Sequence, residues 1–133
     1  MSVERTREVM ERYLNSNHSD LSMMADDVVF TTMATGDEHR GPEGVKRMLE
    51  HVYHEAFDAR AETRSRIYTE DHAVLEADFV GTHTGTFAGV PATGRQVRVP
   101  LCVVYDLRDG KIVRGRVYLE VPVLLRQIGA GKA

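Results

Sequence analysis

Hydrophobic and polar positions repeat with two different periods along the chain, and the change of period separates a helical first part from a strand-rich second part. Residues 3–14 carry their apolar side chains on one stripe and their charged side chains elsewhere, which predicts an amphipathic helix. A second helix is predicted to begin at residues 41–43, Gly-Pro-Glu, because proline is tolerated in the first helical turn. Its apolar face extends to residue 57.

The other apolar runs are typical of strands. A first strand at 28–32 follows a short helix that Ser19 and Asp20 cap and that extends to residue 24. Four more strands are predicted near residues 61–68, 73–82, 95–107 and 111–119, with a final helical turn at 123–128. Asp109 and Gly110 predict a tight hairpin between the last two strands.

Helices that precede a run of strands predict a segregated α+β fold, in which a strongly bent antiparallel sheet wraps around the N-terminal helices as a cone. Two amphipathic helices cannot fill such a cone, so we expect an internal pocket for a small, largely apolar ligand. The 133 residues fit one core, which predicts a single domain over residues 1–133.

Composition excludes several classes of partner. The chain is 42% apolar and 28% charged, and its net charge of −3 provides no electrostatic reason to bind nucleic acid. No apolar run approaches the roughly 20 residues of a membrane span, and the N-terminus is charged where a signal peptide is apolar. We therefore expect a cytoplasmic protein without a nucleic-acid or membrane partner. The single cysteine, Cys102, is interpreted as a small apolar strand residue.

Three side chains are candidates for chemistry. Strand alternation directs His83 inward together with Phe79, unless a bulge at the neighbouring glycines reverses its direction. His83 is then either a hydrogen-bonded strand histidine or an acid/base group. Tyr13 lies on the apolar stripe of the first helix, as a core aromatic residue or a hydroxyl donor. Asp78 alternates with the apolar positions, which favours a carboxylate that faces solvent.

The inward face of the sheet supplies the predicted pocket lining. The predicted ligand-binding residues are Phe30, Thr32, Phe79, Val99, Tyr105, Gly115, Val117 and Leu119. Gly115 either leaves volume for a ligand or relieves crowding where the sheet bends. On the reverse face Pro100, Cys102 and Val104 form a row of small apolar groups, which predicts a homodimer through the sheet.

The remaining histidines are assigned no role. His51 and His54, with Glu55 and Asp58, have a spacing compatible with a divalent metal. They lie opposite the apolar stripe of the second helix, so a solvated helix face is the favoured interpretation. The other three histidines are predicted to lie in turns: His18, His39 and His72. We predict neither a metal site nor a cofactor.

Several motifs resemble one superfamily over nearly the whole chain. These are ADDVVF at 25–30, RGPEGV at 40–45 and the series GTHTG, PATGR and DGKI between residues 81 and 112. They resemble the nuclear transport factor 2-like, or cystatin-like cone, superfamily, and within it the SnoaL-like polyketide cyclases, also called ester cyclases. The resemblance implies ring closure by intramolecular aldol condensation with acid/base side chains in an apolar pocket and without a metal. It implies His83 as the acid/base group.

Similarity to ketosteroid isomerase implies Tyr13 as an oxyanion donor, although the isomerase's base falls near Thr32. The aspartate that many cyclases carry on the last strand falls on Val117. The final aspartate of limonene epoxide hydrolase also aligns with Val117. A second carboxylate of that enzyme aligns near Asp78, which is therefore kept as a reserve candidate for the catalytic carboxylate. Two alternatives follow: a noncatalytic small-molecule binding protein of the same fold, and an epoxide hydrolase, isomerase or dehydratase with a divergent site.

Overall fold

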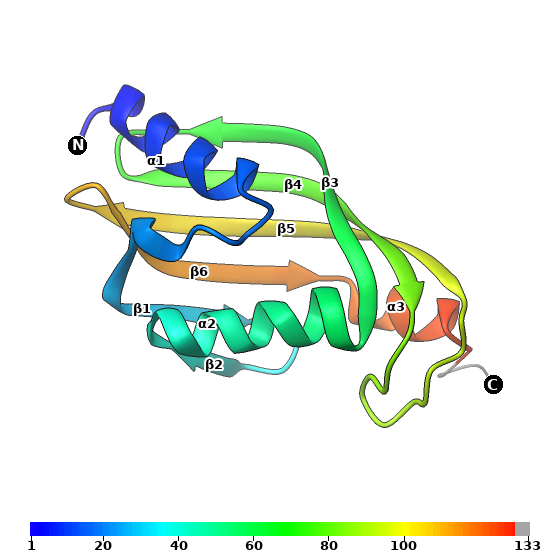
Figure 1. Cartoon of the computed structure of the whole chain (residues 1–133). Helices are drawn as coiled ribbons and strands as arrows, with labels where there is room; N and C mark the ends of the chain where they lie inside the picture. The colour runs from blue at the N-terminus through cyan, green and yellow to red at the C-terminus, as the bar shows by residue number, and fades with distance from the viewer. Residues whose placement is uncertain (130–133) are drawn as a thin grey trace.

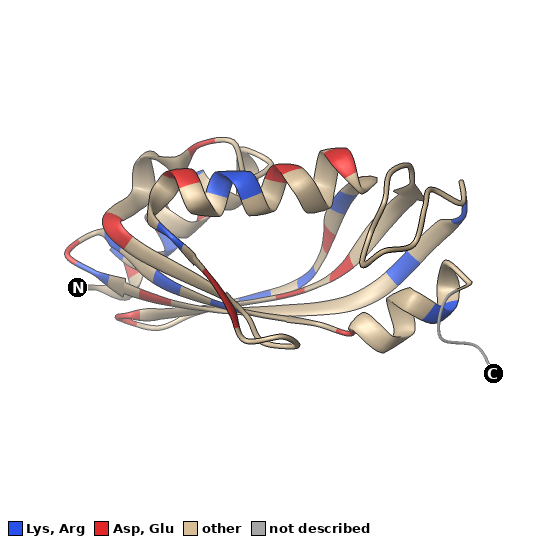
Figure 2. Cartoon of the chain, turned by 90° about the horizontal axis from the view of Figure 1, so that it is seen from below, with Lys and Arg blue, Asp and Glu red and all other residues tan. Residues whose placement is uncertain are grey.

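A curved six-stranded sheet carries two helices on its concave side and a third at one end (Figure 1). The computed structural model describes residues 1–129. Seen from below in Figure 2, the second helix crosses over one face of the sheet. This arrangement confirms the predicted α+β fold class, with a bent and unclosed sheet around helices.

The elements follow one another as in Figure 1. They are α1 (Val3–Asn15), the short helix η1 (Leu21–Met23), β1 (Met24–Thr32), β2 (Asp37–Arg40), α2 (Gly41–Glu50) with its wider final turn η2 (His51–Glu55), β3 (Phe57–Tyr68), β4 (His72–His83), β5 (Gln96–Arg108), β6 (Lys111–Leu119) and α3 (Val121–Gln127). The spatial order of the strands is β2-β1-β6-β5-β4-β3.

Local chemistry explains where the first helices begin. The Ser2 hydroxyl accepts a hydrogen bond from the backbone N–H of Arg5 at 3.0 Å and caps α1. The Asp20 carboxylate does the same for the N–H of Ser22 at 3.0 Å, which confirms the predicted cap of the short helix. Pro42 lies in the first turn of α2, where its missing N–H leaves no helical bond unmade.

The sheet differs from the prediction in two respects. The strand β2 was not predicted, because its four residues are all polar and show no apolar alternation. The sheet is also not wholly antiparallel, since β1 runs parallel to β6 with Thr32 opposite Val117. These two strands are far apart in the sequence, so no hairpin turn dictates their relative direction.

The core lies between the concave face of the sheet and the helices. Val9, Met10 and Tyr13 of α1 are fully buried on that face. Gly115 of β6 lies directly beneath the ring of Phe30, and a Cβ atom at position 115 would come within 2.8 Å of that ring. Gly115 therefore makes room for an aromatic side chain of the core.

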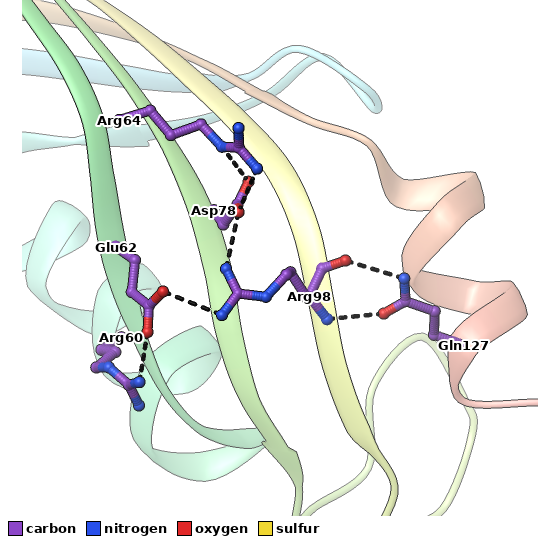
Figure 3. Close-up of polar contacts among 6 residues, drawn as sticks. All are labelled: Arg60, Glu62, Arg64, Asp78, Arg98 and Gln127. Atoms are coloured by element: carbon purple, nitrogen blue, oxygen red, sulfur yellow. Dashed lines mark hydrogen bonds and ion pairs between the residues drawn. The ribbon is translucent and has the colours of Figure 1, made fainter.

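The far end of β5 is completed by a side chain. β6 pairs with β5 only from Leu101 onward. Beyond that point the Gln127 side chain of α3 accepts a hydrogen bond from the backbone N–H of Arg98 and donates one to its carbonyl, both at 2.9 Å (Figure 3). The amide thus takes the place of a neighbouring strand. Among residues 1–129 no helix has the length and apolar character of a membrane span.

Candidate active-site pocket

A largely apolar cavity of about 280 Å³ lies between the concave face of the sheet and the helices. Strands β1, β2, β4, β5 and β6 form one wall, and α1, α2 with η2 and the loop at residues 84–95 form the others. Apolar pockets with a few polar groups are typical sites for small molecules. The predicted internal pocket is therefore present.

Six of the eight predicted ligand-binding residues line this cavity. They are Phe30, Thr32, Phe79, Tyr105, Val117 and Leu119. Val99 is fully buried in the core and is not part of the lining. Gly115 is not part of it either, because the Phe30 ring covers it. The crowding interpretation of Gly115 therefore fits the structure, and the cavity-forming one does not.

Tyr13 lines the cavity and carries a buried hydroxyl group without a hydrogen-bond partner among residues 1–129. Its whole side chain is buried. Burial raises the pKa of Tyr13 well above its usual value, with the neighbouring Tyr105 and Tyr53 as further causes. The ring of Tyr105 meets that of Tyr13 edge-on at a centroid distance of 6.2 Å. Tyr13 is thus a neutral phenol that can donate a hydrogen bond to a ligand.

His18 lies beside Tyr13, although its sequence position indicated only a turn. Its ring centroid is 5.5 Å from that of Tyr13 and 5.1 Å from that of Tyr53, and all three residues line the cavity. Burial lowers the pKa of His18 to about 4, with His54 as a second cause, so the ring is neutral near pH 7. The structure thus adds a neutral imidazole that the sequence analysis missed.

The backbone at His18 is unusual. Asn17 has a φ of 56° and His18 a φ of 63°, both in the left-handed region that non-glycine residues rarely adopt. Asparagine and histidine enter this region more readily than other side chains, so the Asn-His pair at the end of α1 is compatible with such a turn. This backbone directs His18 back over the cavity, and the consecutive polar residues at 15–20 were the sequence feature that could have indicated it.

A second polar group lies at the mouth of the cavity on the unpredicted strand β2. His39 Nε2 lies 3.1 Å from the Thr32 hydroxyl of β1, and both side chains line the cavity. Asp37, two residues earlier, also lines it and accepts a hydrogen bond from the Thr35 hydroxyl at 2.9 Å. His39 had been assigned to a turn because β2 was not recognised.

His51 also contributes to the mouth. Its exposed side chain lines the cavity, with Nδ1 3.3 Å from the Glu55 carboxylate. His51 is exposed, as the predicted solvated helix face requires, and it also borders the cavity from the wider turn η2. Within residues 1–129 no three histidine, cysteine or acidic side chains converge as a metal-ion site would require.

His83 points inward as predicted but does not reach the cavity. It is fully buried opposite Phe57, and no bulge interrupts its pairing. Its ring lies 5.1 Å from the Phe57 ring, which in turn packs at 5.3 Å against Phe79 and Phe87, two residues of the cavity wall. One aromatic layer therefore separates His83 from the cavity. The acid/base role in the pocket that the family resemblance implied for His83 is therefore not supported, because its ring does not line the cavity.

Asp78 lies on the outer, convex face of the sheet, away from the cavity (Figure 3). It is only 3% exposed, because it accepts two hydrogen bonds from Arg64, at 2.7 and 2.9 Å, and one from Arg98 at 2.9 Å. Arg98 also donates to Glu62 at 3.1 Å. The bonds from Arg64 are the main cause that lowers the pKa of Asp78. Asp78 is thus an ionised group with its oxygens occupied. Alternation correctly placed it on the outer face, but the expected exposure to solvent was wrong, because Arg64 and Arg98 bind its carboxylate.

One comparison with known proteins identifies a family. A family model described as SnoaL-like polyketide cyclase matches residues 4–128. No curated protein sequence matches the chain.

Among solved structures, a protein from Jannaschia sp. CCS1, described as a SnoaL-like polyketide cyclase, has 19% identity and a TM-score of 0.84, covering 97% of this chain and 94% of its own. TsrD from Streptomyces laurentii has 24% identity and a TM-score of 0.81, with 98% of each chain covered. A ketosteroid isomerase-like protein from Catenulispora acidiphila, in complex with trimethylamine, has 17% identity and a TM-score of 0.74, covering 94% of this chain and 95% of its own. At these identities the three structures establish the fold.

Proposed function

Because the chain belongs to the SnoaL-like polyketide cyclase family, we propose that it closes a ring by intramolecular aldol condensation in a small, largely apolar carbonyl compound. The observation that carries the proposal is the Tyr13 hydroxyl, fully buried at the wall of an apolar cavity and without a partner among residues 1–129. A buried donor without a partner is unfavourable, and a ligand oxygen would satisfy it.

Tyr13 is proposed to stabilise the enolate. Removal of a proton from the carbon next to a carbonyl places negative charge on the carbonyl oxygen, and a donor already in position stabilises that charge most where water is excluded. Tyr13 stays protonated because burial raises its pKa. His18, held neutral by its lowered pKa of about 4, is the second donor for the same oxygen.

His39 is proposed as the base. Its ring accepts the proton from the carbon, and the resulting enolate carbon attacks a second carbonyl of the same molecule to form the new carbon–carbon bond. The alkoxide produced then takes the proton back from His39, so the ring closes to a hydroxyketone with no other reactant consumed and no water released. The contact between His39 Nε2 and the Thr32 hydroxyl at 3.1 Å orients the ring.

This assignment gives no catalytic role to His83 or Asp78. His83 lies behind the Phe57 ring, and Asp78 lies on the opposite face of the sheet. Proton transfer requires contact with the substrate or one intervening water, and neither residue lines the cavity. The six predicted residues that line the cavity are retained as the ligand-binding set.

The proposal is tested with the bicyclic ketone 2-tetralone in D₂O. Its protons beside the carbonyl are acidic carbon-bound protons, and nuclear magnetic resonance follows their replacement by deuterium. We expect the protein to accelerate this exchange well above the buffer rate, with competitive inhibition by 2-naphthol, whose phenolate imitates the enolate. A rate equal to that of the buffer, for a ketone that isothermal calorimetry shows to be bound, would contradict proton abstraction in this cavity.

A noncatalytic binding protein is the second candidate, and the cavity lining favours it in one respect. Among the described lining residues Asp37 is the only carboxylate, and it is exposed at the mouth. Position 117, where many cyclases carry an aspartate, is valine. This alternative predicts binding of 2-tetralone and 2-naphthol without any acceleration of exchange.

We also propose a homodimer through the outer face of the sheet. Ile67 is 54% exposed and Tyr118 45% exposed, and the small apolar side chains Pro100 and Cys102 lie near Tyr118. A second copy would remove this apolar surface from water. Sedimentation equilibrium should show a dimer that Tyr118→Glu dissociates, and a wild-type monomer would overturn the proposal.

A further inference from the structure

The loop at residues 84–95, between β4 and β5, reaches over the cavity. Its residues Phe87 and Ala88 line the cavity wall, although the rest of the loop lies outside it. Phe87 and Val90 exchange two backbone hydrogen bonds of 3.0 and 2.8 Å, which closes the tip into a small hairpin. Ala88 and Gly89 have positive φ values of 50° and 79°, as such a tight tip requires. The loop thus presents a self-contained tip to the cavity.

The outgoing limb of the loop is attached to the end of η2. The backbone N–H groups of Thr84 and Gly85 both donate to the Ala56 carbonyl at 3.0 Å. Gly85 lies so close to Glu55 that a Cβ atom would come within 2.2 Å of its carbonyl oxygen, so no other residue fits there. This limb is therefore held by backbone contacts.

The returning limb is held by His83. Its backbone accepts a hydrogen bond from Gly94 and donates one to Arg95, both at 2.9 Å. Its ring adds a side-chain contact, because Nδ1 accepts a hydrogen bond from the Thr93 backbone N–H at 3.2 Å and lies 2.9 Å from the Thr93 hydroxyl. Thr93 itself is exposed, so the fully buried imidazole ties an exposed segment to the sheet.

The same ring supports the tip through an aromatic contact. His83 packs against Phe57 at 5.1 Å between centroids, and Phe57 packs edge-on against Phe87 at 5.3 Å. Movement of the loop away from the sheet would therefore break the Thr93 contact and the contact of Phe87 with Phe57 together.

The other ring nitrogen is left unsatisfied. Because Nδ1 accepts from Thr93, the hydrogen of the neutral ring is on Nε2. Nε2 is buried and has no partner among residues 1–129. A buried N–H without a partner is unfavourable. The ring therefore makes its only side-chain hydrogen bonds among residues 1–129 through Nδ1, to Thr93.

We propose that residues 84–95 form a lid over the cavity and that His83 is a positioning residue that latches it through Thr93. The lid closes over the ligand that the proposed function places in the cavity, but the latch itself does not depend on any reaction there. Phe87 and Ala88 set the shape of the closed cavity on this side. Opening admits and releases the ligand, as in enzymes whose loops gate access to the site.

The first test is hydrogen exchange of the lid amides in the absence of a ligand, compared between two replacements of His83. His83→Phe retains a ring but lacks the acceptor, and His83→Asn retains an acceptor near the Nδ1 position. We expect His83→Phe to accelerate exchange at Thr93 and Gly94 by roughly fivefold or more, with the β5 amides unchanged, and His83→Asn to restore protection. Equal protection in wild type and His83→Phe would overturn the latch, as would a loss spread evenly over the sheet.

Two further variants keep the test decisive if a replacement of His83 does not fold. Thr93→Val removes only the hydroxyl contact and should accelerate exchange in the lid to a smaller degree. Thr86→Ala alters an exposed lid residue outside the latch and should leave exchange unchanged.

Binding kinetics provide the second readout. Stopped-flow fluorescence with 2-naphthol should show faster association and faster dissociation in His83→Phe, with a smaller change in Kd. If a variant exchanges its lid amides faster but binds 2-naphthol with unchanged rate constants, the loop does not gate the cavity. Both measurements can succeed when 2-tetralone exchange fails, so they separate the lid from the proposed chemistry.

Discussion

The two faces of the curved sheet both bury polar groups, but in opposite states. On the convex face Asp78 is 3% exposed and accepts hydrogen bonds from two arginines. On the concave side Tyr13 is fully buried and its hydroxyl has no partner within residues 1–129. His18 lies beside it as a neutral ring at the cavity wall.

The contrast shows which property of a buried polar group indicates function. Burial alone is shared by Asp78 and Tyr13, so it does not distinguish a structural group from a catalytic one. Unused hydrogen-bonding capacity combined with a place in the cavity lining does distinguish them, because such a group is unfavourable unless a ligand satisfies it. Both conditions are needed, since His83 Nε2 also lacks a partner among residues 1–129 but His83 does not line the cavity. The convex cluster has used its hydrogen-bonding capacity within the chain, whereas the Tyr13 hydroxyl has no partner among residues 1–129 and is proposed to donate to a ligand.

The largest effect on activity is expected on the concave side, from replacement of the proposed base His39. His39→Gln keeps a polar side chain beside Thr32 but cannot accept a proton, so we expect the exchange rate of 2-tetralone to fall by about 1,000-fold. Calorimetry with 2-naphthol should show binding close to that of the wild type. Wild-type exchange in this variant would remove His39 from the mechanism.

The pH dependence of stability tests the state of His18. Its pKa is lowered from 6.5 to about 4, so the unfolded chain binds a proton more readily than the folded chain between these values. The contribution of neutral His18 to the free energy of unfolding is therefore fully present above pH 6.5. It is lost as the pH falls toward 4, by a total of about 3 kcal/mol.

The matched variant for this measurement is His18→Asn, because asparagine tolerates the left-handed backbone at position 18. Urea titrations from pH 7 to pH 4 should show a shallower loss of stability in the variant than in the wild type. Parallel curves would mean that His18 titrates normally and is exposed to water.

Removal of the unused hydroxyl should affect catalysis and stability in opposite ways. Tyr13→Phe deletes a donor to the enolate oxygen, and we expect about a 100-fold lower rate of 2-tetralone exchange. Thermal denaturation should give an unchanged or higher Tm, because the lost hydroxyl had no partner among residues 1–129. A clearly lower Tm would indicate that the hydroxyl is satisfied in solution, which would weaken the contrast between the two faces.

The smallest effect on activity is expected on the convex face. Asp78→Asn removes the charge that Arg64 and Arg98 share, so the Tm should fall while 2-tetralone exchange stays within about twofold of the wild type. The reverse outcome, intact stability with lost exchange, would place Asp78 in the mechanism as the reserve carboxylate.

Sequence patterns were sufficient where backbone geometry alone decides the outcome. The stripe at residues 3–14 predicted α1, and alternation correctly directed His83 inward and Asp78 outward. The polar strand β2 and the parallel pairing of β1 with β6 were missed, because neither leaves a local pattern in the sequence. His39 was missed together with β2, and His18 because its side chain returns to the cavity from a turn.

Away from register shifts such as those at Thr63/Ser65 and Asp106/Leu107, the sequence by itself determined the face of the sheet on which a strand side chain lies, since successive residues of a strand point to opposite sides. Only the tertiary structure decided what each inward side chain meets. Phe57 covers His83, and Phe30 fills the space over Gly115, whereas Tyr13 is part of the cavity lining. These neighbours come from distant parts of the chain, so their packing, and with it the position of the candidate site, arises only when the whole sheet curves around its helices.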